Sequence, residues 1–214
     1  MRHAGLLSAC AAAVLLAAGG GVALGLADDS GSKPAPAKSA SPAADSVDAG
    51  FARDMAVHHQ QAVEMSFVVR DRTDDEDVRR LAYDIANTQA NQRGMLIGWL
   101  DLWELPKASP AQPPMSWMGM APSEDPGGSG VLMPGMATKA EIARLSKARG
   151  KEAEILYLQL MTDHHKGGIH MAEYCGEHCE VPTERRLAAG MAAAQESELG
   201  LMADLLKERG AAPR

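Results

Sequence analysis

Aromatic residues are scarce in this chain of 214 residues: they make up 4% of it, while methionine occurs 13 times. Because straight-chain side chains lose little rotamer freedom in a helix, a core of Ala, Leu and Met favours helices over sheets. Basic residues are also few, and the formal net charge of −7 argues against a nucleic-acid-binding protein. Methionine fills gaps in many cores, so its abundance alone does not predict a metal site.

The N-terminus lacks charged residues over a long apolar run, residues 6–26, which ends in a small-residue sequence suited to cleavage. This run predicts a signal peptide or an uncleaved membrane anchor over residues 1–27, and its length suffices for either. We therefore expect an exported protein, extracellular or at the cell envelope, with N-terminal membrane contact if the segment is retained. A lipoprotein-type box at residues 7–10 precedes most of the run, which disfavours lipidation. Residues 28–47, rich in Ser, Pro and Ala, predict a disordered linker.

An internal repeat organises the remaining sequence, residues 48–210. The segment Met55-x-x-His58-His59 returns at residues 161–165 as Met161-x-x-His164-His165, and the register continues without a gap. Further matching pairs are Val63 with Ile169, Met65 with Met171, Leu81 with Leu187, Ile85 with Met191 and Gln89 with Gln195. The repeat predicts two similar helix pairs, repeat one over 48–104 and repeat two over 138–210, which are separated by a Met-rich crossover over 105–137.

Helical periodicity and capping residues predict four helices, over about 48–70, 73–104, 138–180 and 182–210. Asp48 is the expected cap of the first helix. Capping boxes predict the start of the second at Thr73 and of the third at Thr138, and Gly150 and Gly167-Gly168 are candidate interruptions of the third. Two short-looped helix pairs joined by one long crossover have the connectivity of a ferritin-like four-helix bundle. The predicted fold class is therefore all-α, a ferritin-like four-helix bundle made of two repeated helix pairs.

The repeated methionine and histidines have the spacing of ligands on one sector of a helix. In each copy the methionine lies three and four residues before the two histidines, so it can reach the same point as either of them. Met65 lies about 15 Å along the helix axis from Met55, so one metal ion cannot bind both. Pairing of the first and third helices would bring together four or more donors from Met55, His58, His59, Met161, His164 and His165.

Thioether and imidazole groups form a soft donor set, which suits copper and above all Cu(I). Di-iron bundles instead place carboxylates at the inward positions, where this chain has Gln89 and Gln195. These glutamines either orient the imidazoles or form hydrogen bonds within the core. A single Met-x-x-His on an apolar face usually serves core formation. Four buried imidazoles at matching positions are harder to explain that way, because each needs a partner.

Two further clusters of soft side chains lie outside the repeat. The crossover contains Met115-Ser116-Trp117-Met118-Gly119-Met120 and Met133-Pro134-Gly135-Met136, which either capture copper weakly or pack the crossover onto the bundle. The segment Cys175-Gly176-Glu177-His178-Cys179 occurs in the second copy only. It allows a disulfide at a frayed helix end or an additional soft site formed by Cys175, His178 and Cys179.

Three segments resemble the bacterial family known as domain of unknown function 305: Gly50-Phe51 to Met65, Met133-Pro134-Gly135-Met136, and Leu160-Met161-x-x-His164-His165-x-x-Gly168-Ile169-x-Met171. The resemblance covers about residues 48–209. It implies a ferritin-like fold, export and, for some members, copper binding and copper tolerance. The metal ligands that it implies here are Met55, His58, His59, Met65, Met161, His164, His165 and Met171. The segment 175–179 is not part of the pattern of this family.

The leading hypothesis is an exported copper-binding protein, with Cu(I) as the favoured ion. It would sequester copper at the cell envelope or transfer it to a delivery partner protein. The sequence shows no evident nucleophile-and-base arrangement and no Gly-rich phosphate loop, which favours a binding protein over an enzyme. The alternatives are a metal-dependent oxidase-type enzyme on a ferritin-like bundle and a structural bundle without metal.

Overall fold

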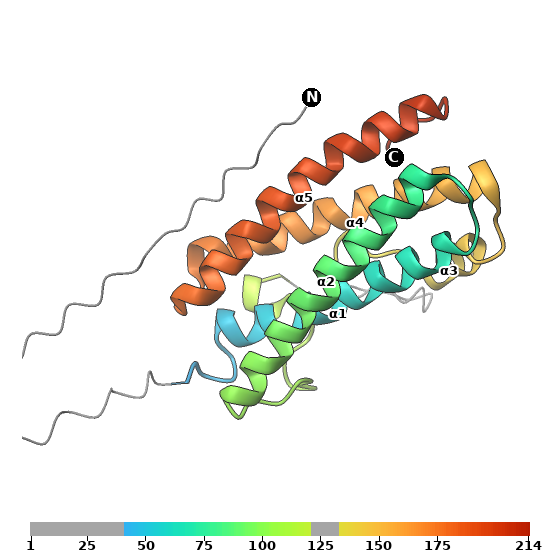
Figure 1. The fold of residues 1–214 in the computed structure, drawn as a ribbon. Helices are drawn as coiled ribbons and strands as arrows, with labels where there is room; N and C mark the ends of the chain where they lie inside the picture. The colour runs from blue at the N-terminus through green and yellow to red at the C-terminus, as the bar shows by residue number, and fades with distance from the viewer. Residues whose placement is uncertain (1–40, 121–132) are drawn as a thin grey trace, which may run out of the picture. The chain divides into compact units, whose positions relative to one another are not determined.

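The computed structural model describes residues 41–120 and 133–214. Within these ranges the chain is helical and contains no strand, as the sequence predicts (Figure 1). The elements are α1 (Val47–Arg70), α2 (Glu76–Leu102), the 3-10 helix η1 (Ser116–Met118), α3 (Lys139–Leu145), α4 (Gly150–His178) and α5 (Pro182–Glu208). The expected signal peptide or anchor, most of the linker and residues 121–132 of the crossover lie outside the described residues. Among the helices that are described, none combines the length and the apolarity that a membrane span requires.

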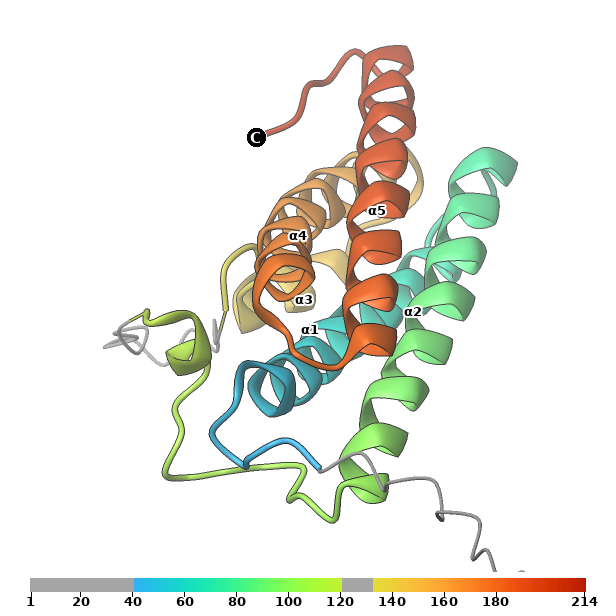
Figure 2. The same cartoon turned by 90° about the vertical axis from the view of Figure 1, so that its left-hand side faces the viewer.

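Two helical hairpins form the bundle. Helices α1 and α2 pack against each other, α4 and α5 do the same, and the two hairpins meet where α1 contacts α4. The start of the crossover leaves the end of α2 and returns past α1, which η1 contacts (Figure 2). This arrangement confirms the predicted fold class, an all-α bundle of two helix pairs joined by a long crossover.

The N-terminal cap of α1 is Ser46, whose hydroxyl accepts the N–H of Ala49. The prediction of Asp48 as this cap is wrong. The Asp48 carboxylate instead accepts the N–H groups of Glu180 and Val181, at distances of 3.1 and 2.7 Å, immediately before α5 begins. Asp48 therefore ties the start of α1 to the connection between α4 and α5, a contact between residues far apart in the sequence.

The second helix begins later than predicted. Asp75 caps α2 by accepting the N–H of Val78, while the Thr73 hydroxyl accepts the N–H of Asp75. The capping box predicted at Thr73 is therefore wrong, because a better-placed carboxylate lies two residues further on. The capping box at Thr138 is confirmed.

The predicted third helix is two helices. Helix α3 ends at Leu145, and Gly150, with φ of +52°, starts α4 in a conformation that favours glycine. Gly167 and Gly168 do not interrupt α4. A Cβ atom at Gly167 would collide with the carbonyl oxygen of Pro134, so this glycine lets the backbone of the crossover lie directly against α4.

The buried apolar side chains form two clusters. The Met65 cluster joins the C-terminal half of α1 to the first half of α4, and it includes Met65, Met161, Tyr157, Ile85 and Met202. The Met55 cluster joins the first half of α1 to the second half of α4, and it includes Met55, Met171, Phe51, Met191 and both cysteines of α4. Each cluster therefore combines the first methionine of one repeat with the second methionine of the other.

Candidate metal centre

Four histidines lie at the contact between α1 and α4, between the two methionines of each helix. His58, His59, His164 and His165 are all fully buried. The rings of His58 and His164 stack, with centroids 3.7 Å apart and an angle of 36° between their planes. The structure therefore brings the histidine pairs of the two repeats together, as the repeat pattern predicts.

Three of these histidines are held through Nε2. His164 Nε2 lies 2.9 Å from the carbonyl oxygen of His58, and His58 Nε2 lies 3.3 Å from that of Pro134. His165 Nε2 lies 2.6 Å from a carboxylate oxygen of Glu198. A carbonyl oxygen or an ionised carboxylate can only accept, so we assign the proton of each neutral ring to Nε2.

This assignment leaves the Nδ1 atom of each ring with a free lone pair. The Nδ1 atoms of His58, His164 and His165 are buried and have no hydrogen-bond partner among the described residues. Neither ring nitrogen of His59 has one. Buried polar atoms are nearly always paired, whereas a metal-binding histidine donates one ring N–H to a carbonyl or carboxylate and uses the other nitrogen for the metal. The unpaired atoms fit ligation of a metal ion.

Burial keeps the rings of His58, His59 and His164 neutral. It lowers the pKa of His58 to about 4 and, with the nearby His58 ring, that of His59 to about 3. Burial and the charge of His58 also lower the pKa of His164 well below its ordinary value. The Gln92 amide raises the pKa of His59 by a smaller amount, although it does not form a hydrogen bond of normal geometry with the ring. Neutral imidazole is the form that binds metals, so these rings need not lose a proton first.

The two repeats carry different residues at the position that lies beside the second histidine of each pair. Glu198, which holds His165, corresponds in the repeat register to Gln92, which lies near His59. Glu198 was not predicted from the sequence, because the repeat pattern is carried by matching residues and position 92 holds a glutamine instead; the register itself contained the signal. Gln89 and Gln195 are buried, and both polar atoms of the Gln89 side chain and Oε1 of Gln195 have no partner in the described chain.

The eight predicted ligands do not converge on one point. All four methionines among them are fully buried, but Met55 and Met171 belong to one core cluster and Met65 and Met161 to the other. The ten-residue separation within each helix, about 15 Å along the axis, keeps the two methionine pairs apart.

The methionines of the crossover serve mainly as core. Met115 and Met133 are buried in the Met55 cluster, and Met118 and Met136 pack against it. The Trp117 ring lies edge-on to Phe51 and Tyr174, and its Nε1 donates to Asp54. Among the alternatives for this segment, the described residues favour attachment of the crossover to the bundle.

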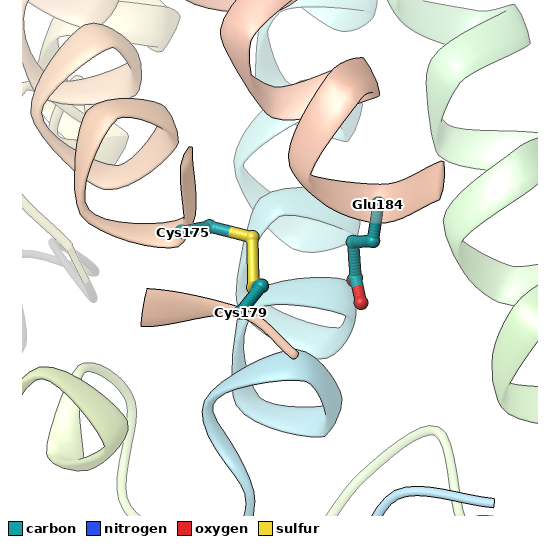
Figure 3. A group of neighbouring side chains, drawn as sticks. All are labelled: Cys175, Cys179 and Glu184. Atoms are coloured by element: carbon teal, nitrogen blue, oxygen red, sulfur yellow. A yellow bond between two sulfur atoms is a disulfide. The ribbon is translucent and has the colours of Figure 1, made fainter. Parts of the chain in front are cut away.

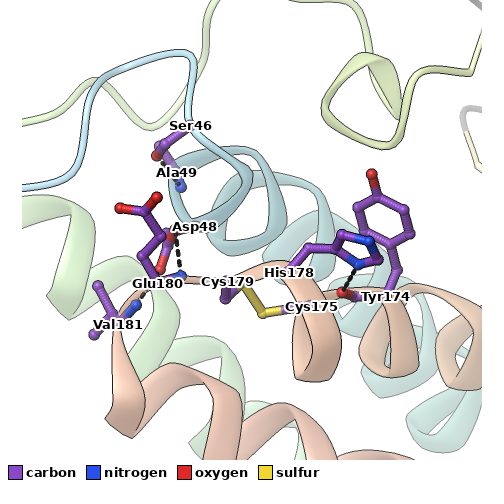
Figure 4. The surroundings of a disulfide bond; sticks show 9 residues. All are labelled: Ser46, Asp48, Ala49, Tyr174, Cys175, His178, Cys179, Glu180 and Val181. Atoms are coloured by element: carbon purple, nitrogen blue, oxygen red, sulfur yellow. Dashed lines mark hydrogen bonds between the residues drawn. A yellow bond between two sulfur atoms is a disulfide. The ribbon is translucent and has the colours of Figure 1, made fainter.

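The cysteines of α4 form a disulfide. Cys175 and Cys179 are bonded at 2.04 Å at the C-terminal end of the helix (Figure 4). The exposed His178 ring stacks on Tyr174, and its Nδ1 donates to the Tyr174 carbonyl oxygen. The alternative of a soft site that includes His178 is therefore not formed.

Comparisons with known proteins place this chain in a family. A protein of the same family from Streptomyces coelicolor, described as a candidate secreted protein, has a structure with a TM-score of 0.74 and 67% identity, over 80% of this chain and 99% of that one. A DUF305 fragment from Deinococcus radiodurans has a TM-score of 0.61 and 28% identity, over 76% and 96% of the two chains. CopM in its Cu(I)-bound form has a TM-score of 0.57 and 18% identity, over 75% and 96%.

The similarity to CopM shows a shared fold. CopM structures with silver and with Cu(II) are similar as well, and no curated protein matches the sequence. The family model described as "Domain of unknown function (DUF305)" matches residues 48–206, which includes every histidine and methionine of the centre. The chain belongs to the DUF305 family.

Proposed function

We propose that this protein binds copper, as Cu(I), at the centre between α1 and α4, and that it sequesters or transfers copper outside the cytoplasm. The observation that carries the proposal is the set of buried Nδ1 atoms on His58, His59, His164 and His165 that have no partner among the described residues. The fold that the chain shares with CopM, which has been crystallised with Cu(I), Cu(II) and silver, supports the same conclusion. Export rests on the apolar segment over residues 1–27 and agrees with the description of the Streptomyces coelicolor relative.

The proposed ligands combine imidazoles with two thioether pairs. Met55 and Met171 would bind on one side of the histidines, and Met65 and Met161 on the other. Thioether sulfur and neutral imidazole select Cu(I) over harder cations. Because the methionine pairs lie in different clusters, we expect more than one copper ion for each chain.

The two alternatives have less support. A structural bundle would have to bury these polar atoms without compensation, which costs stability for each of them. An oxidase of the di-iron type uses glutamates from all four helices. On α2 and α5 the corresponding repeat positions hold Gln89 with Gln195 and Gln92 with Glu198, so one of these four residues is a carboxylate, and it contacts His165.

An anaerobic Cu(I) titration against a chromophoric competitor tests the proposal. The full chain is compared with a variant in which His58, His59, His164 and His165 are changed to Ala, and with a control in which the exposed His170 and His178 are changed to Ala. We expect tight binding by the wild type and the control, and its loss in the first variant. Cu(I) should also raise the Tm of the wild type, since a ligand of the folded state stabilises it.

The other outcomes are equally informative. Equal binding by all three proteins would move the metal to the crossover methionines or the cysteines. Absence of binding by the wild type would reject copper as the ligand. Far-ultraviolet circular dichroism of the four-histidine variant distinguishes lost ligands from lost fold.

A further inference from the structure

A buried carboxyl group lies beside the disulfide of α4. Glu184, in the first turn of α5, is fully buried, and neither of its carboxyl oxygens has a hydrogen-bond partner among the described residues. A carboxyl oxygen of Glu184 and the sulfur atoms of Cys175 and Cys179 all lie within 4.8 Å of one another (Figure 3). Three candidate donor atoms therefore face one small volume.

The surroundings of Glu184 compensate only in part for its burial. The neighbouring acid, Asp48, uses its two oxygens to accept the N–H groups of Glu180 and Val181. Burial is the largest cause that raises the pKa of Glu184 to about 9, followed by the negative charge of Asp48 and by an interaction between the two carboxyl groups that falls short of normal hydrogen-bond geometry. The start of α5 favours an acidic residue, but a buried carboxyl group without a well-formed hydrogen bond to any described residue still lowers stability. A cation bound between Glu184 and the sulfur atoms would take the place of the proton.

The sulfur atoms are suitably placed for ligation once the bond between them is broken. Cys175 and Cys179 are four residues apart, so their side chains leave the same side of the helix. The N–H of Cys179 donates to the carbonyl oxygen of Cys175 at 2.9 Å, a hydrogen bond that does not depend on the disulfide. Both residues are buried in the Met55 cluster, which surrounds them with apolar side chains. Reduction therefore leaves two thiols close to one another and to Glu184.

We propose that the Cys175–Cys179 disulfide is a redox-controlled metal site, which binds a thiophilic divalent cation such as Zn²⁺ through Cys175, Cys179 and Glu184 after reduction by a dithiol. In the reduction, the dithiol gives two electrons and two protons to the disulfide. The S–S bond of the chain breaks, an S–S bond forms in the dithiol, and two cysteine thiols result. The metal ion then displaces the thiol protons and the carboxyl proton, which pass to solvent.

Two thiolates and a carboxylate form a ligand set that zinc accepts. The site is distinct from the histidine centre, and the proposal does not depend on copper binding there. Cys175, Cys179 and Glu184, which are not among the proposed copper ligands, would bind the metal ion here.

Cd²⁺, a spectroscopic substitute for Zn²⁺, tests the site through the thiolate-to-metal charge-transfer absorption in the ultraviolet. The full chain, with its third cysteine replaced in every sample (Cys10→Ser), is titrated anaerobically in its oxidised form and after reduction by a dithiol that is then removed. We expect the reduced chain to develop the absorption with one equivalent of Cd²⁺ and to lose it when Zn²⁺ is added in excess. The oxidised chain should show none. The absence of the absorption in the reduced chain would overturn the proposal.

Variants define the ligands. Glu184→Gln, which keeps the size of the side chain, should weaken Cd²⁺ binding by at least about tenfold, while Glu177→Gln, at an exposed position of the same segment, should leave it unchanged. Equal affinity of the two variants would remove Glu184 from the site. Glu184→Asp provides a second test if Glu184→Gln does not fold, and it should also weaken binding because its carboxylate is shorter by one methylene group.

Two further variants separate this site from the copper centre. The double variant with Cys175→Ser and Cys179→Ser should show no charge-transfer absorption after reduction. If the absorption persists in this variant, the two cysteines are not the ligands. The variant with all four histidines of the centre changed to Ala should keep the absorption after reduction. Its loss there, with the fold intact, would place the metal at the histidine centre instead.

Discussion

His165 Nε2 lies 2.6 Å from Glu198 Oε2, so a carboxylate on α5 holds a fully buried histidine of α4. The hydrogen bond fixes the proton on Nε2 and turns the Nδ1 lone pair toward the protein interior, where it has no partner in the described chain. Carboxylates in this position orient histidine ligands and raise their basicity. Glu198 is therefore a positioning residue for the proposed copper centre.

Replacement of Glu198 by Gln should weaken Cu(I) binding by about 10- to 100-fold, because the neutral amide no longer enforces this tautomer. Competitive titration of the two proteins measures the change. Glu196→Gln, at an exposed position of the same helix, is the matched control and should bind as the wild type does. If Glu198→Gln retains full affinity, His165 does not depend on this carboxylate for binding.

Gln92 occupies the position of Glu198 in the first repeat, and Gln92→Glu should give His59 a carboxylate partner. A negative charge beside an imidazole favours its protonated form, so the pKa of His59 should rise from about 3 toward its ordinary value. Titration followed by NMR of the ring protons measures this change in the metal-free protein. Asn91→Asp adds the same charge at an exposed neighbouring position and should leave the pKa of His59 low. A pKa of His59 that is equally low in both variants would show that residue 92 does not face this ring.

Much of the fold follows from local signals in the sequence. The helical period, the capping box at Thr138 and Pro182 at the start of α5 each act over a few residues, so they could be recognised without the structure. The repeat likewise predicted that the two histidine pairs come together, because it places them at matching positions of two similar helix pairs.

The features that could not be predicted depend on contacts between distant segments. Asp48 resembles a cap of its own helix, but its carboxylate serves residues 180 and 181. The division of the methionines into two pairs requires the direction in which α4 runs against α1, which the repeat alone does not give. The burial of Glu184 likewise depends on the contact between the α4–α5 connection and α1.

The metal-free protein should lose stability as the pH falls below 6.5. The pKa values of His58 and His59 are about 4 and about 3 in the folded state, against an ordinary value of 6.5. Between these values the unfolded chain binds protons that the folded chain does not, so acidification favours unfolding. Each such histidine should contribute about 1.4 kcal/mol per pH unit to the slope.

Urea denaturation at several pH values from 7 to about 5 measures this slope, within the window in which the unfolded histidines titrate. His59→Gln removes one titrating ring and should reduce the slope by an amount that grows to about 1.4 kcal/mol per pH unit near pH 5, where the unfolded ring is fully protonated. His170→Gln changes an exposed histidine and should leave the slope close to that of the wild type. Equal slopes for the two variants would contradict the assignment of His59 as a buried neutral ring.

The contact between Gly167 and the crossover links stability to the histidine centre. A Cβ atom at position 167 would collide with the carbonyl group of Pro134, and the same carbonyl oxygen accepts a hydrogen bond from His58 Nε2. Gly167→Ala should therefore lower the free energy of unfolding by about 1–3 kcal/mol, because backbone must move to make room. It should also weaken Cu(I) binding, since the crossover can no longer hold the His58 ring in place.

Gly94→Ala provides the control for this substitution. Gly94 lies within α2, and a Cβ atom there would meet no atom within 4 Å. Alanine at such a site should raise the free energy of unfolding by about 0.4–1 kcal/mol and leave copper affinity unchanged. Urea denaturation and Cu(I) titration of both variants test the pair. If Gly167→Ala were as stable as Gly94→Ala, the crossover would not lie directly against α4, and the support that it gives to His58 would have to come from another part of the chain.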